Sequence, residues 1–246
     1  MTKTMGAIVG DFTDPRRSGD LPEAVAAARP LSWRPLAVAD LDDVYALHGQ
    51  AIAAMSDPSL VKPETRAFFA GILAGGGRIV GAFDDRGLVA YGVLQLDLPR
   101  SEDARPVIGL APSVRLAKFA GASVRPADWG RRLHGALIDQ RLEAARQAGV
   151  AQVYATAAPG NAHSWTNLLD AGFHIRALRR KYGGHWRYLV FRAVERVPPP
   201  SADGAGVWSA ATDVRATQKL MEQGRAGVAW RRRDDGGYEI LFARLA

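Results

Sequence analysis

The segment from residue 123 to residue 149 constrains the fold most strongly, because it reads as a strand that turns into a long helix. The strand ends at Val124, a proline follows at position 126, and a helix is predicted from about Gly130. Apolar residues then recur at helical spacing from Leu133 to Ala145, and Gly149 supplies a helix-ending glycine. A turn of this kind leaves the first N–H groups of the helix unpaired, and these groups favour a bound phosphate.

Two arginines stand at the start of this helix, and they add positive charge where a phosphate would bind. We interpret Arg131 and Arg132 as phosphate contacts, since a guanidinium group pairs well with phosphate oxygens. The alternative is a solvated arginine pair at a helix start, beside a surface turn that binds nothing.

The composition excludes several classes of site and of protein. The 246-residue chain is 48% apolar, which is enough for a sizeable core, yet it has no apolar run of membrane length and no signal peptide. We therefore expect a cytoplasmic protein. The absence of cysteine excludes disulfides, cysteine–zinc sites and cysteine nucleophiles. A net charge of +7 suits a site for a polyanionic ligand and also permits nucleic-acid binding.

The order of predicted elements indicates a mixed α/β fold. Residues 1–30 lack periodicity and are expected to form a flexible leader. The expected elements after it are a short strand near Trp33, helices from Val38 and from Pro63 to Leu73, a hairpin of strands Ile79–Phe83 and Leu88–Leu96, a strand from Leu116 to Val124, the central helix, a strand from Val150 to Ala157, a helix from about Ala162, and a hairpin of Phe173–Arg180 with Trp186–Val194.

This element order and two partial motifs resemble the GNAT (GCN5-related) acyl-CoA N-acyltransferases. Val124-Arg125-Pro126 fits the start of the family's pyrophosphate loop, whereas Trp129, Arg132 and His134 stand where the family has Arg or Gln and two glycines. Asn161, Ser164, Leu168 and Gly172-Phe173 fit the family's last helix. The resemblance covers a predicted domain from residue 31 to residue 196.

The resemblance implies transfer of an acetyl or other short acyl group from acyl-CoA to an amine, without a metal. The acceptor would be an amine of a small molecule or peptide, and the chain is compatible with a homodimer. Acetyl-CoA is the expected cosubstrate. The positions that correspond to the family's cofactor-binding residues are Ala122, Val124, Trp129, Gly130, Arg131, Arg132, Leu133, His134, Asn161 and Ser164.

The acid and base of such a reaction are not evident in the sequence. The family's tyrosine position holds Leu168, and the strand Leu116–Val124 has no Asp or Glu. Tyr182, Tyr154 and His163 are the catalytic candidates, with His134 as a further one. Each has a structural alternative: a turn residue, a core residue, and a cap or surface residue. Catalysis by orientation, with water carrying the proton, is also open.

Residues after the main domain resemble its last unit. A proline-rich linker is expected at 197–205, and residues 206–246 are expected to form a strand, a helix from about Asp213 to Gln223, and a hairpin. Leu220–Gly224 matches Leu168–Gly172, which suggests a partial internal duplication; chance similarity between two such units is the alternative. The second helix is expected to be shorter, and to lack a counterpart of the Pro-Gly-Asn-Ala-His opening.

Two functions of other classes compete with acyl transfer. One is a catalytically inactive GNAT-fold module that binds acyl-CoA or a protein partner, which the departures at Trp129, Arg132, His134 and Leu168 favour. The other, less favoured, is nucleic-acid binding by a basic strip that interleaves with aromatic residues. The strip comprises Arg176, Arg179, Arg180, Lys181, Arg187, Arg231, Arg232 and Arg233, with Trp186, Tyr188 and Trp230.

Overall fold

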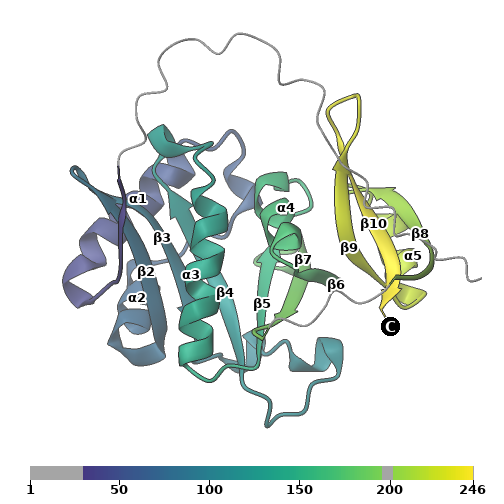
Figure 1. Ribbon diagram of the computed structural model, residues 1–246, viewed down its shortest axis with the longest axis horizontal. Coiled ribbons are helices and arrows are strands. Elements are labelled where there is room, and N and C mark those ends of the chain that lie inside the picture. The colour runs from purple at the N-terminus through teal and green to yellow at the C-terminus, as the bar shows by residue number, and fades with distance from the viewer. Residues whose placement is uncertain (1–29, 196–201, 246) are drawn as a thin grey trace, which may run out of the picture. The chain divides into compact units, whose positions relative to one another are not determined.

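A computed structural model describes residues 30–195 and 202–245 (Figure 1). The expected leader, except Pro30, and most of the expected linker lie outside these ranges. The strands are β1 (Ser32–Pro35), β2 (Gly77–Asp84), β3 (Gly87–Gln95), β4 (Leu116–Val124), β5 (Gln152–Ala157), β6 (His174–Lys181), β7 (His185–Ala193), β8 (Ala202–Ala210), β9 (Arg225–Arg232) and β10 (Tyr238–Leu245). The α-helices are α1 (Leu41–Ala53), α2 (Arg66–Gly71), α3 (Leu133–Gln147), α4 (Ala162–Asp170) and α5 (Val214–Glu222).

The described strands form one mixed sheet in the order β1-β2-β3-β4-β5-β7-β6-β9-β10-β8. Only β4 and β5 pair in parallel within it, and the other neighbours pair antiparallel. The helix α3 connects the two parallel strands, as a parallel pair requires a crossover. The predicted mixed α/β fold is confirmed.

Strand alternation places helices on both faces of the sheet. Ile79 of β2 packs in one cluster with residues of α1 and α2, whereas its neighbour Val80 packs in another cluster with Leu133 and Leu137 of α3. Successive strand residues point to opposite faces, so α1 and α2 cover one face and α3 the other. The helix α4 joins the α3 side, because Trp165 and Leu168 share a cluster with Ile138.

The strands β4 and β5 separate partway along their length. Their pairing runs from Leu116↔Gln152 to Phe119↔Ala155, and within the described chain β4 has no partner on that side beyond this point. A bulge in β4 lies at the same level, since the register with β3 shifts between Phe119 and Ala122. A bulge bends the strand that carries it, which accounts for the divergence. The result is a V-shaped gap between β4 and β5.

Two helices begin later than the sequence suggested. The central helix was expected from Gly130 but begins at Leu133, because Gly130 (φ +85°) and Arg132 (φ +58°) have left-handed backbones that no α-helix contains. The second helix was expected from Pro63 to Leu73, whereas the α-helix begins at Arg66 and, after Gly71, continues as a π-helix over Ile72–Gly76. Thr65 accepts a hydrogen bond from the Phe68 N–H and so caps it.

The tail forms the predicted strand–helix–hairpin unit and extends the sheet. It joins at a single pair, Ile175 of β6 with Gly227 of β9. The helices α4 and α5 have nine residues each, so the expectation of a shorter second helix was wrong. The helix opening also has a counterpart, because Asn161 and Asp213 both cap their helices by accepting a backbone N–H. The strand β8 begins at Ala202, before the expected boundary at residue 206.

One constant shift of 52 residues relates the two units. It carries α4 onto α5, Gly172 onto Gly224, and the β6–β7 bulge at Arg176 onto the β9–β10 bulge at Val228. It also relates Ile175 to Gly227, so the joining pair consists of equivalent residues, as a local two-fold axis requires. These correspondences support the duplication, which stays a hypothesis.

We predict that Gly227→Val weakens the junction between the tail and the main sheet. A Cβ atom at Gly227 would lie 2.9 Å from the Ile240 side chain and 3.0 Å from that of Ile175, with β-strands on both sides. Overpacking of this kind costs about 1–3 kcal/mol. The free energy of unfolding in urea measures the loss. Arg232→Val, at an exposed site of the same strand, is the control and should change stability by less than about 0.5 kcal/mol. Equal effects of the two changes would contradict the described packing.

Candidate functional site

A cleft of about 840 Å³ opens at the gap between β4 and β5. One wall consists of residues 119–124 of β4, the loop and first turn of α3, and the start of α4. The opposite wall consists of α1 and the segment after it, with Tyr182 from the β6–β7 turn, while Tyr238 of the tail packs on Trp165 of α4 and completes the lining. All the residues predicted to bind cofactor line this cleft except Arg131.

The edge of β4 offers backbone donors to the cleft. The N–H of Arg125 donates to Val89 O of β3 at 2.7 Å. Because successive N–H groups of a strand point to opposite sides, those of Val124 and Ala122 point away from β3, into the gap. The Trp129 indole N–H donates to Val124 O at 2.9 Å, which ties the following loop to the end of the strand. The ring of Trp129 is half exposed at the mouth of the cleft.

In the loop before α3, Arg132 adopts a left-handed backbone conformation that is usually found at glycine. Arg132 stands at the first motif-glycine position and has a left-handed backbone, which costs an L-residue about 1 kcal/mol. The N–H groups of the first turn of α3 have no intrahelical acceptor, and no side chain in the described part of the chain caps them. These donors and the positive helix end form a site suited to a phosphate group.

The two arginines of this loop have different roles. Asp128 is buried and pairs with Arg131 and with Arg125, and Arg125 also binds Asp84 at 2.5 Å. The Arg125 guanidinium holds the pKa of Asp84 well below its usual range. This network fixes the loop and turns Arg131 toward Asp128. Arg132 is exposed and lines the cleft, so it is the better placed of the two to contact a phosphate.

His134 occupies the second motif-glycine position, in the first turn of α3. Its ring lines the cleft, and its Nδ1 atom is buried without a hydrogen-bond partner among the described residues. Desolvation, with the nearby charges of Arg141 and His163, lowers the pKa of His134 to about 3. The ring is therefore neutral at physiological pH.

The start of α4 forms the far side of the same wall. Asn161, His163 and Ser164 all line the cleft, and Asn161 Oδ1 accepts the Ser164 N–H at 3.3 Å. The side chain of His163 is exposed there.

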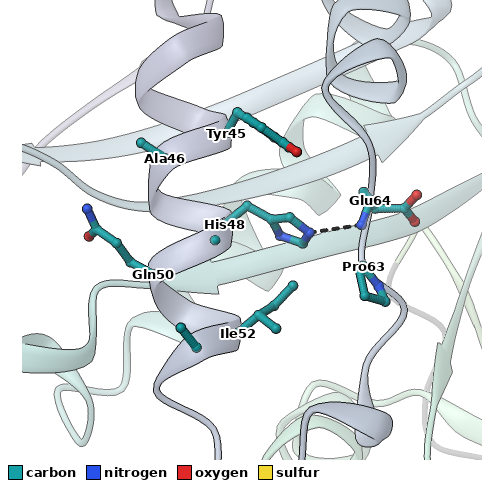
Figure 2. Close-up of a pocket in the computed structure, with 9 residues that line it drawn as sticks. Tyr45, Ala46, His48, Gln50, Ile52, Pro63 and Glu64 are labelled. Atoms are coloured by element: carbon teal, nitrogen blue, oxygen red, sulfur yellow. Dashed lines mark hydrogen bonds between the residues drawn. The ribbon is translucent and has the colours of Figure 1, made fainter.

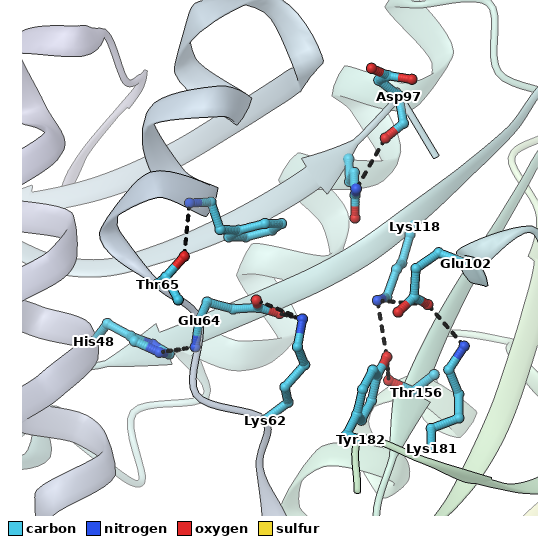
Figure 3. Close-up of polar contacts among 12 residues, drawn as sticks. His48, Lys62, Glu64, Thr65, Asp97, Glu102, Lys118, Thr156, Lys181 and Tyr182 are labelled. Atoms are coloured by element: carbon cyan, nitrogen blue, oxygen red, sulfur yellow. Dashed lines mark hydrogen bonds and ion pairs between the residues drawn. The ribbon is translucent and has the colours of Figure 1, made fainter. Parts of the chain in front are cut away.

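Tyr182 brings a hydroxyl group into the cleft (Figure 3). Lys118 of β4 donates to this hydroxyl at 3.0 Å, and Thr156 of β5 lies 3.3 Å from it. Lys118 is buried and also pairs with Glu102 at 3.1 Å. Burial by itself would lower the pKa of Lys118, but Tyr182 and Glu102 outweigh it and raise that pKa. A charged ammonium group therefore sits beside the Tyr182 hydroxyl.

Tyr154, the second catalytic candidate, lies outside the cleft. Its side chain is fully buried, and its hydroxyl donates to Glu102 O at 2.5 Å. Burial raises the pKa of Tyr154 above its usual value. Ala155 and Thr156 line the cleft, whereas the Tyr154 ring stacks on Phe191 and its hydroxyl is held by the Glu102 carbonyl.

Glu64 is a cleft residue that the sequence did not reveal, since Pro63-Glu64 reads as a helix start. The helix begins later, and the buried Glu64 carboxylate faces the cleft and pairs with Lys62 at 2.8 Å (Figure 3). The Glu64 N–H donates to His48 Nε2 at 2.9 Å, which fixes the segment to α1 (Figure 2).

His48 is a positioning residue. Its Nε2 accepts a backbone N–H, so the ring proton of the neutral imidazole is on Nδ1, 2.8 Å from the Tyr91 hydroxyl. Desolvation lowers the pKa of His48, which favours this neutral form. Tyr91 in turn lies 3.2 Å from the Ser123 hydroxyl at the cleft. The chain of contacts connects α1 to the edge of β4.

Several members of the basic strip are buried or ion-paired. Arg187 and Tyr188 are buried, and Arg187 donates to Ser59 O at the cleft. Lys181 pairs with Glu102, and Arg231 pairs with Glu239 at 2.7 Å.

Among the described residues no group of three or more His, Asp or Glu side chains could hold a metal ion. No helix in the described ranges has the length and apolar content to cross a membrane.

Comparisons with known proteins find similar folds among solved structures but no match by sequence family. No family model matches the chain, and no curated protein matches it. Solved structures of N-acetyltransferases do match. The ribosomal-protein-S18-alanine N-acetyltransferase of Escherichia coli has 16% identity and a TM-score of 0.52, covering 69% of this chain and 97% of its own.

Two further structures contain ligands. The yncA protein of Salmonella typhimurium with its cofactor acetyl-CoA has 16% identity and a TM-score of 0.53, covering 70% of this chain and 99% of its own. The NatC complex bound to Gag peptide and CoA has 11% identity and a TM-score of 0.52, covering 66% of this chain and 98% of the matched chain. The chain therefore has the fold of the GNAT N-acetyltransferases.

Proposed function

We propose that this protein transfers a short acyl group from acyl-CoA to an amine of a small molecule or peptide. One observation carries the proposal: the gap between β4 and β5 opens directly onto the uncapped start of α3. An extended arm with an amide group fits the gap between β4 and β5, and a pyrophosphate fits the start of α3. Acyl-CoA combines both in one molecule and would supply the acyl group as a thioester.

The residues present fit this cosubstrate. The N–H groups of Ala122 and Val124 would bind the amides of the pantetheine arm, and the first turn of α3 would bind the pyrophosphate with Arg132. Asn161 and Ser164, at the start of α4, line the same cleft, where they would contact the arm. We propose no metal and place the reaction in the cytoplasm.

We assign the proton transfers to Glu64 and Tyr182. The Glu64 carboxylate would take a proton from the attacking amine as the C–N bond forms. The Tyr182 hydroxyl would give its proton to the CoA thiolate as the C–S bond breaks, and the ammonium group of Lys118 stabilises the tyrosinate that remains. The two groups come from different elements and line the same cleft, with Lys62 Nζ 5.2 Å from the Tyr182 ring.

An inactive module that only binds acyl-CoA is the second candidate. The half-exposed Trp129 ring and the His134 ring at a motif-glycine position favour it, because they take up space at the loop. Binding without turnover over a broad set of amines would support this module.

We predict that Arg132→Ala weakens CoA binding about tenfold, because it removes a positive charge from the proposed phosphate site. Calorimetric titration with CoA measures the affinity, and the loss should shrink at high salt. Arg146→Ala is the matched control, since this exposed arginine stands at the other end of α3 and pairs with Glu143. Equal CoA affinities of the two variants would show that Arg132 does not contribute to CoA binding.

We also predict that Tyr182→Phe and Glu64→Gln each lower kcat about 100-fold while CoA binding is retained. Release of free thiol from acetyl-CoA, with a panel of small amines and peptides, measures the rate. Tyr45→Phe, at an exposed tyrosine of α1, is the control and should keep full activity. Full activity of both cleft variants would contradict the assigned proton transfers.

A further inference from the structure

A buried arginine stands in the wall of the cleft, in the apolar stripe of α3. Arg141 lies one turn after Leu137, and only 3% of it is exposed. Its guanidinium group stacks on the Phe119 ring, with 4.3 Å from Cζ to the ring centroid. Phe119 is the last β4 residue paired with β5, so the guanidinium group lies at the vertex of the gap.

The guanidinium group is only partly bonded. Its Nε donates to Leu137 O at 3.0 Å, and no other hydrogen bond or ion pair of Arg141 exists among the described residues. The neighbouring titratable group on the helix face is His134, which is neutral. The two terminal nitrogens, which form the fork that matches a carboxylate, therefore have no anionic partner. Burial lowers the pKa of Arg141 to about 9, so the group is still charged at neutral pH.

The surroundings accommodate this arginine specifically. A Cβ atom at Gly92 of β3 would lie 2.9 Å from Arg141 Nε, so glycine leaves the room that the guanidinium group fills. A buried charge without an anionic partner is strongly unfavourable, whereas a leucine would extend the apolar stripe without this penalty. A ligand that brings a negative charge would offset the penalty.

The position of Arg141 indicates which part of a ligand would reach it. It lies about 12 Å along α3 from Leu133, at a rise of about 1.5 Å per residue. A cosubstrate with its pyrophosphate at the start of α3 and its arm along β4 would bring its acyl end to this vertex. The phosphates would be bound at the other end of the same wall.

We propose that Arg141 binds a carboxylate at the end of the acyl group, so that the preferred donor is the CoA thioester of a short dicarboxylic acid. This inference rests on the proposed function and narrows its acyl donor. The two Nη atoms would each donate a hydrogen bond to one carboxylate oxygen in a bidentate contact, while Nε keeps its bond to the Leu137 carbonyl.

Two thioesters of equal carbon number test the inference by calorimetric titration of the full-length protein. Succinyl-CoA and butyryl-CoA both carry four-carbon acyl groups, and they differ in a terminal carboxylate against a methyl group. We expect succinyl-CoA to bind at least about tenfold more tightly. Arg141→Met should abolish the preference and leave butyryl-CoA affinity unchanged or improved, and Arg141→Lys should keep part of it.

Gly92→Ala is a second variant, which displaces the guanidinium group without removing its charge and should reduce the preference if Arg141→Met fails to fold. Equal affinities of the wild type for the two thioesters would overturn the inference and leave the proposed function intact. No binding of either thioester, or of CoA, would overturn both.

Discussion

The separation of β4 from β5 is the constraint on which the cleft depends. The strand β4 stays paired with β3 up to Val124, while β5 continues along β7 to Ala157, so the two parallel neighbours cannot remain together beyond the bulge. Unpaired backbone donors are costly when they are buried, which requires that water or a ligand occupies the gap. The opening is thus a property of the sheet itself, and the side chains decide what enters it.

Charge is distributed unevenly around this opening. The start of α3 contributes its uncapped N–H groups and Arg132, whereas the network of Asp84, Arg125, Asp128 and Arg131 neutralises itself. Behind the Tyr182 hydroxyl, Glu102 pairs with both Lys118 and Lys181. The unbalanced positive groups are therefore placed where a pyrophosphate and, at the vertex, a carboxylate would stand.

Local patterns in the sequence predicted most of the fold. The bounds of β4 were correct, and so was the start of α4, because apolar runs and a capping asparagine mark them locally. The start of α3 was not predicted, since nothing in the sequence indicates that Arg132 would adopt a glycine-like backbone. The tail helix was expected from about Asp213 to Gln223, which agrees with the observed helix Val214–Glu222 and its cap at Asp213, and only the expectation that it would be shorter than α4 was wrong.

The candidate site was predictable only in part. The β4 donors and the α3 loop follow from a motif, so they were expected. Glu64 was missed because it reaches the cleft through a segment held by His48, a contact between residues 16 positions apart. Lys118 of β4 donates to the Tyr182 hydroxyl, which comes from the β6–β7 turn, and Arg141 is notable only because its terminal nitrogens have no anionic partner among the described residues. Tertiary contacts of this kind leave no local signal.

Backbone amide NMR of the protein titrated with CoA tests the central claim most directly. The account predicts that the amide signals of Ala122, Val124 and the first turn of α3 shift together as CoA saturates one site. Signals of the exposed β9–β10 turn, at residues 233–237, should stay unchanged and serve as the internal reference. Unchanged signals of Ala122 and Val124 at saturating CoA, or shifts confined to residues of the basic strip, would contradict the account.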